Sequence, residues 1–225
     1  MLQAGRKLAS NAAVGLVAIV LAAGAISGQA APAANQAQKD YTQADVEFVQ
    51  GMIYHHAQAV VMSDWAPTHG ARPDLITLCR RIGLSQRDEI NMMQHWLEDR
   101  HLPTPDPLNM LPADSGRAHD SGSMGDMSMP GMSMGDHSIM PGMLTPAQLK
   151  QLDTARGIDF DRLYLTDMIR HHEGALGMVA KLFDAPGSGQ QPDLFNFATD
   201  VDAGQRAEIT RMQAMLNTLN TSQTR

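Results

Sequence analysis

Two short motifs carry the residues best suited to metal chemistry. The sequence Met-Ile-Tyr-His-His at 52–56 returns as Met-Ile-Arg-His-His at 168–172, and in each case another Met follows six residues after the second His. At about 100° per residue, these side chains fall on one face of a helix. The candidate helical ligands are Met52, His55, His56, Met62, Met168, His171, His172 and Met178.

The ligand types favour one metal. Thioethers are soft donors that suit Cu(I), with Ag(I) as its mimic, whereas imidazole also binds Cu(II), zinc and nickel. The methionines therefore supply the discrimination, with Cu(I) preferred and Cu(II) as a second option. The chain has 17 Met and 9 His but only one Cys, so a Cys-rich metal site is excluded. Ligands without thiolate suit an oxidising compartment.

A structural interpretation competes with this one. Methionines at helical spacing often fill a core, and duplication of a hairpin could copy paired histidines passively. Adjacent residues also point about 100° apart on a helix, so one His of each pair could support the other or face solvent. Met93 and Met212 are core candidates that could also complete a site, and Glu89 and Glu208 could orient a ligand His.

A second candidate region is rich in methionine and lacks other large apolar residues except Ile139. Met-x-Met and Met-x-x-Met recur within residues 124–143, in a stretch of Gly, Pro, Ser and Asp that reads as a flexible loop. Mobile thioethers can gather around Cu(I), although a low-complexity linker would have a similar composition. The candidate loop ligands are Met124, Met127, Met129, Met132, Met134, His137, Met140 and Met143.

Helical patterns surround this loop. Thr42 with Asp45 resembles an N-cap, Pro73 begins a second helix, and Thr145-Pro146 begins a third pattern. Gly157 separates a short lead-in helix from a longer one over about 159–183, and Pro192 opens the last helix. The halves repeat, and one helical hairpin cannot bury its own apolar stripe. The sequence therefore predicts an all-α four-helix bundle, with hairpins at 40–102 and 146–220 and a flexible Met-rich loop at 103–145.

The first 30 residues have the pattern of an export signal. Arg6 and Lys7 precede an apolar run to about Ile26 and then small residues, which is typical of a signal peptide, with an uncleaved anchor as the alternative. The net charge of -7 and the lack of basic clusters argue against nucleic acid and, beyond this segment, against a membrane surface. We expect a periplasmic or otherwise extracytoplasmic protein.

The repeated core Met-Ile-x-His-His-x-x-Ala-x-x-Met, preceded by Asp and an aromatic residue, resembles the family called domain of unknown function 305. The resemblance covers both hairpins and is especially close at 168–175. It implies a ferritin-like four-helix fold, a role in copper binding and tolerance, no established catalytic activity, and metal ligands at the Met and His positions of both motifs. The first half departs from the second, with Tyr54 and Gln58 where the second has Arg170 and Gly174.

We therefore expect a copper-binding protein that is not an enzyme, acting in sequestration or in transfer to another copper protein. One rival is a ferritin-like di-metal enzyme, which needs Glu-x-x-His on two helices. The only such spacing joins Glu98 to His101, just before Pro103. A second rival is a structural or interaction bundle whose His and Met are incidental.

Overall fold

The computed structural model describes residues 40–107 and 140–222. The chain divides into two units, 1–38 and 39–225, and the expected signal segment lies outside the described residues, as do 108–139. The described part of the second unit contains five helices and no strand: α1 (Gln43–Trp65), α2 (Pro73–Asp99), α3 (Pro146–Thr154), α4 (Gly157–Asp184) and α5 (Pro192–Ser222). The all-α prediction is confirmed.

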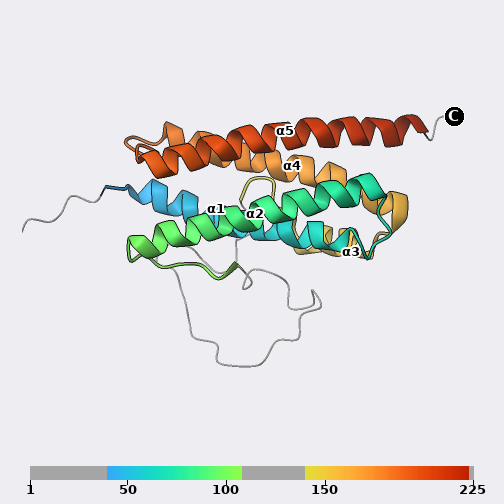
Figure 1. Ribbon diagram of the computed structural model, residues 1–225, viewed down its shortest axis with the longest axis horizontal. Coiled ribbons are helices and arrows are strands. Elements are labelled where there is room, and N and C mark those ends of the chain that lie inside the picture. The colour runs from blue at the N-terminus through green and yellow to red at the C-terminus, as the bar shows by residue number, and fades with distance from the viewer. Residues whose placement is uncertain (1–39, 108–139, 223–225) are drawn as a thin grey trace, which may run out of the picture. The chain divides into compact units, whose positions relative to one another are not determined.

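The four long helices form two hairpins that pack side by side (Figure 1). Helix α1 packs along α2, α4 packs along α5, and α1 joins the hairpins through its contact with α4. The short α3 contacts both α1 and α4. None of the described helices is long and apolar enough to cross a membrane.

Local sequence signals set the helix ends. Thr42 and Asp45 form a capping box at α1, in which each side chain satisfies the other residue's backbone N–H. Thr145 and Gln148 do the same at α3, which has Pro146 in its first turn. Gly157 begins α4 with a positive φ of 58°, a conformation that favours glycine.

Two buried carboxylates tie the hairpins together reciprocally. Asp45 on α1 accepts a hydrogen bond from the backbone N–H of Gly189, in the α4–α5 loop, at 2.7 Å. Asp161, its repeat counterpart on α4, accepts one from the backbone N–H of Arg72, in the α1–α2 loop, at 3.3 Å. Each hairpin thus supplies the acceptor for the other's loop. A buried N–H without a partner is costly, so these bonds favour one arrangement of the hairpins.

The hydrophobic core has two parts. One combines the first half of α1 and the second half of α2 with the end of α4 and the start of α5. The other combines the remaining halves with α3. The paired histidines interrupt the apolar pattern where these two clusters meet, at the middle of α1 and α4. The fold therefore places polar side chains in the interior at one level of the bundle.

Candidate metal centre

The four paired histidines come together inside the bundle. His55, His56, His171 and His172 are each 0% exposed, so the sequence-based option that one of each pair faces solvent is wrong. The ring centroids of His55 and His171 lie 3.8 Å apart, across the contact between α1 and α4. Those of His55 and His56 are separated by 6.4 Å and those of His171 and His172 by 6.3 Å. We call this cluster the histidine chamber.

The outer histidine of each pair is held by a carboxylate. His56 Nε2 donates to Glu89 on α2 at 2.5 Å, and His172 Nε2 donates to Glu208 on α5 at 2.7 Å. Burial alone would raise the pKa of Glu89, but hydrogen bonds from His56 and Ser85 lower it by more than burial raises it. The net effect is a lowered pKa, so the carboxylate stays charged. A carboxylate on one ring nitrogen orients the other toward a metal. The sequence-based role for both glutamates matches this geometry.

The chamber contains nitrogens without hydrogen-bond partners. These buried atoms are Nδ1 of His55, His56 and His172 together with both ring nitrogens of His171. A buried polar atom without a partner costs about 1–3 kcal/mol, and such groups call for an explanation such as a bound ion. The donor set therefore fits a metal that accepts imidazole nitrogen.

Burial also keeps the inner imidazoles neutral. Desolvation, reinforced by the neighbouring His56, lowers the pKa of His55 to about 3. Desolvation, reinforced by His55, lowers the pKa of His171 well below its ordinary value. Neutral imidazole is the form that binds metals, so no proton has to leave these two rings before they coordinate one.

The methionines of the two motifs differ in exposure. Met52, Met62 and Met168 are each 0% exposed and belong to the core clusters, whereas Met178 is half-buried. Met93 and Met212 are also buried in the core. Core packing therefore accounts for most of these side chains, and their predicted role as ligands rests on the chemistry of the thioether.

The segment 140–144, which we call the strap, lies against the chamber. The sequence placed it in the flexible loop, but the structure docks it against α1 and α4. His55 Nε2 donates to the carbonyl oxygen of Pro141 at 3.1 Å. The buried Gln58 amide donates to the Leu144 carbonyl at 3.0 Å and accepts from the Leu144 N–H at 2.7 Å. These hydrogen bonds fix the strap.

Two glycines allow the strap to approach this closely. A Cβ on Gly174 would lie 1.9 Å from the carbonyl oxygen of Pro141, and one on Gly142 would lie 2.5 Å from the carbonyl oxygen of Arg170. Gly142 also has a positive φ of 80°. Gln58 and Gly174 occupy equivalent positions of the two repeats, one of the positions at which the repeats differ, and the strap explains both residues. That departure was the one sequence signal for this contact.

The other predicted loop ligands, Met124, Met127, Met129, Met132, Met134 and His137, lie outside the described residues. Met140 and Met143 are described, and both are half-buried. Among the described residues, no three or more His, Cys, Asp or Glu side chains converge on one point as a preformed metal site. The histidine chamber therefore offers imidazole nitrogens in pairs, the closest rings being those of His55 and His171. Burial raises the pKa of the Cys79 thiol to about 12, so this residue supplies no thiolate.

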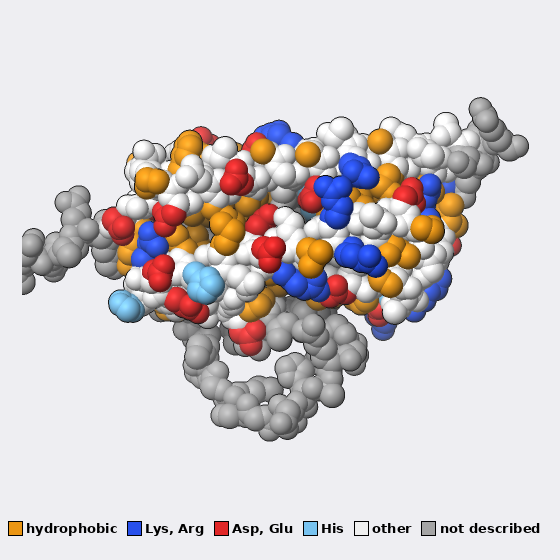
Figure 2. Space-filling model, in the orientation of Figure 1, with side chains coloured by type: hydrophobic (Ala, Val, Ile, Leu, Met, Phe, Trp, Pro, Cys, Tyr) orange, Lys and Arg blue, Asp and Glu red, His pale blue; other side chains and the backbone are white. Residues whose placement is uncertain are grey.

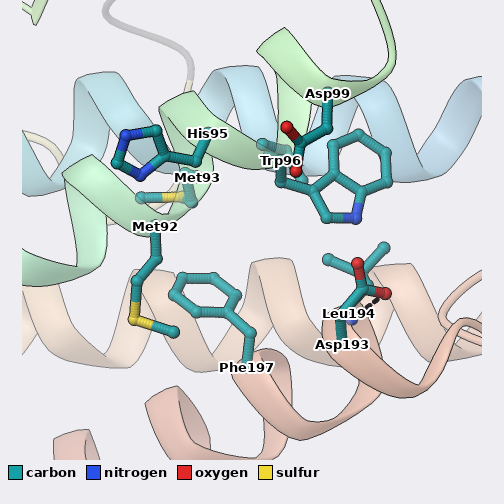
Figure 3. Close-up of a pocket in the computed structure, with 9 residues that line it drawn as sticks. Met92, Met93, His95, Trp96, Asp99, Asp193, Leu194 and Phe197 are labelled. Atoms are coloured by element: carbon teal, nitrogen blue, oxygen red, sulfur yellow. Dashed lines mark hydrogen bonds between the residues drawn. The ribbon is translucent and has the colours of Figure 1, made fainter.

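A separate hollow of about 270 Å³ lies between α2 and α5 and contains none of the predicted ligands. Figure 3 shows Met92, Trp96 and Phe197 around it. Figure 2 shows hydrophobic side chains at the surface of this part of the bundle, with acidic ones nearby. Arg100 covers the Trp96 ring at 4.1 Å from its centroid. The hollow is mainly apolar and offers no counterpart of the histidine chamber.

Comparison with known proteins agrees with this architecture. Residues 45–216 match the model of the family described as domain of unknown function (DUF305). The structure resembles that of a putative secreted DUF305 protein from Streptomyces coelicolor, with 26% identity and a TM-score of 0.61, covering 80% of this chain and 95% of that one. It also resembles CopM in its Cu(II)-bound form, with 26% identity and a TM-score of 0.55, covering 77% of this chain and 96% of that one.

A shorter match reaches a viral protein. A stretch of 58 residues, 26% of this chain, is 38% identical to the uncharacterised protein L153 of Acanthamoeba polyphaga mimivirus. The match spans 38% of the length of that protein. It therefore adds a relative in sequence without indicating an activity.

Proposed function

Because this chain belongs to the DUF305 family, we propose that it is an extracytoplasmic copper-binding protein that prefers Cu(I). The observation that carries the proposal is the histidine chamber. In it, two imidazole–carboxylate pairs, one from each hairpin, flank two neutral imidazoles with unpartnered nitrogens. Burying ring nitrogens without hydrogen-bond partners at the centre of a bundle is costly, and a bound metal would offset that cost.

Ligand chemistry supports copper over harder metals. Imidazole accepts Cu(I), Cu(II), zinc and nickel, while thioethers favour Cu(I) and Ag(I). The methionines expected as ligands in the segment 124–143 would add thioethers, and Met140 and Met143 among them belong to the strap. CopM has been solved with Cu(II), Cu(I) and silver bound. By this proposal, the loop collects Cu(I) and the chamber retains it.

The proposed role is binding rather than catalysis, in sequestration and tolerance or in transfer to another copper protein. A di-metal enzyme would use inward-facing Glu-x-x-His motifs. Glu98 and His101, which form the one such spacing in the sequence, are both exposed near the end of α2. The proposed location outside the cytoplasm is supported by the signal-like N-terminus and by the similar structure described as a putative secreted protein.

The test is a Cu(I) titration against a chromophoric chelator under reducing conditions. We compare the protein with H55N/H171N, in which near-isosteric amides replace the inner imidazoles, and with H95N/H101N, which alters two exposed histidines outside the chamber. Thermal melts establish that each variant is folded. The proposal predicts that H55N/H171N loses the tightest copper equivalent and that the control retains it. Equal stoichiometry and affinity in all three proteins would contradict the chamber as a copper site.

A further inference from the structure

Two thioethers from distant parts of the chain meet beside one glycine. Gly51 lies on α1, and a Cβ placed there would be 3.6 Å from the sulfur of Met140 and 3.3 Å from the methyl carbon of Met178. Met140 begins the strap and Met178 lies on α4. The two side chains therefore converge on the surface of α1, where the absent side chain of Gly51 leaves room for both.

These thioethers differ from the other methionines of the motifs in their accessibility. Met140 and Met178 are half-buried, whereas Met52, Met62 and Met168 are each 0% exposed. A metal arriving from solvent can reach the first two without opening the core. They are thus placed to bind a metal outside the chamber.

The repeat shows that this arrangement is specific to one side of the bundle. The counterpart of Gly51 in the second hairpin is Asp167, which forms an ion pair with Arg170 at 3.2 Å. The counterpart of Met178 is Met62, which is packed in the core. Of the two equivalent helices, only α1 therefore has a glycine, Gly51, beside a half-buried methionine of the other hairpin, Met178. Duplication of a hairpin does not account for the pair.

We propose that Met140 and Met178 form a two-thioether site for Cu(I), the outer thioether site, which receives the ion before it reaches the histidine chamber. This inference rests on the proposed function. It adds the route by which Cu(I) reaches the histidine chamber, which passes Met140 and Met178. Two neutral soft donors select Cu(I) or Ag(I) over zinc and calcium. Because thioethers carry no proton, binding at this site releases none.

The strap connects the outer thioether site to the chamber. Met140 is followed by Pro141, whose carbonyl oxygen accepts the hydrogen bond from His55 Nε2. Gly51 lies one helical turn before His55 on the same helix. A metal held by Met140 would therefore lie next to the residue whose carbonyl oxygen accepts the hydrogen bond from His55. The inward route that we infer for the ion therefore passes this contact between the strap and His55.

The experiment uses the full chain labelled with ¹³C at the methionine methyl groups and titrated with Ag(I), a redox-stable substitute for Cu(I). We expect the Met140 and Met178 methyl signals to move together. M140L should abolish the shift of Met178, and M178L that of Met140, each weakening Ag(I) binding at this site about tenfold or more. M92L, which alters a methionine that is 56% exposed on α2, is the matched control and should leave both shifts unchanged.

The outcomes separate this inference from the function on which it rests. If Ag(I) perturbs the chamber histidines while Met140 and Met178 stay silent or respond independently, the outer thioether site is wrong and copper binding stands. If H55N/H171N loses the chamber response but the two methyl signals still move together, the outer thioether site is supported as a separate site. If no residue responds to Ag(I), both proposals fail. Leucine is close to methionine in volume, so the variants are expected to fold.

Discussion

The two hairpins contain the same pair of a histidine and a glutamate, but the hydrogen bonding of the inner histidine differs between them. In both, the outer histidine is bonded to a glutamate on the second helix of its own hairpin, through His56 and Glu89 or His172 and Glu208. The inner histidine of the first hairpin, His55, donates to the strap, whereas neither ring nitrogen of His171 has a hydrogen-bond partner. Both repeats thus contain the paired histidines, and the strap makes the two inner histidines unequal. The unequal pair makes His171 the more available ligand.

The largest expected effect comes from breaking the strap contact at Gly174. A side chain there meets the Pro141 carbonyl, so the strap must move away from α4 or α4 must shift. We expect G174V to lose about 4 kcal/mol of unfolding free energy, measured by denaturant titration. The matched control is G177A, since a Cβ on Gly177 on the same helix meets nothing within 4 Å. That change should stabilise the protein by about 0.5–1 kcal/mol, and equal destabilisation by both variants would count against the strap.

Acid should expose the cost of burying two neutral imidazoles. With burial holding the pKa of His55 at about 3 and that of His171 well below its usual range, the folded chain binds fewer protons than the unfolded chain below about pH 6.5. Stability is therefore complete above that pH and falls as the pH drops toward 3. The lowered pKa of His55 alone should cost about 3 kcal/mol at pH 4, and that of His171 adds to the loss in the same direction. Denaturant titrations across this pH range measure the unfolding free energy at each pH. That free energy should depend less on pH in H55N/H171N than in the unaltered protein, and an equal dependence in both would contradict the assignment.

Removing the Gln58 amide should release the other end of the strap. Q58A leaves the buried N–H and carbonyl of Leu144 without partners. We expect a loss of about 2 kcal/mol in unfolding free energy. Hydrogen exchange at the Leu144 amide should accelerate in parallel. Protection equal to that of the unaltered protein would show that Gln58 does not hold the strap.

The two glutamates offer the most even comparison between the hairpins. E89Q and E208Q keep the shape of the side chain but remove the charge that orients His56 or His172. Each should weaken Cu(I) binding by about tenfold, near the lower limit for loss of a carboxylate behind a ligand histidine. Competition with a chelator measures the affinity. A loss in one variant alone would show that only that hairpin supplies a carboxylate-supported ligand.

Much of the fold could be predicted because its signals are local or repeated. The caps at Thr42 and Thr145, the start of α2 at Pro73 and the break before Gly157 follow from short-range rules. The repeat then indicates two hairpins that must share a core, and it marks Glu89 and Glu208 as candidates to orient His56 and His172.

The strap could not be predicted, because its composition is that of the loop and its position depends on long-range contacts. The sequence shows that the equivalent residues Gln58 and Gly174 differ, but it does not show that Gln58 bonds Leu144 or that Gly174 leaves room for Pro141. The reciprocal bonds of Asp45 and Asp161 to the opposite loops were missed for the same reason. Helical spacing also does not distinguish Met178, which is half-buried, from Met62, which is fully buried.

The central claim is that the inner imidazoles of the chamber bind copper. Its most direct test is ¹⁵N NMR of the histidine side chains during titration of the full chain with Cu(I) under anaerobic, reducing conditions. We predict that the ring nitrogens of His171 and His55 shift at the first bound equivalent, and that those of the exposed His95 and His101 do not. Binding of copper while the His55 and His171 nitrogens remain at their original frequencies would contradict the claim.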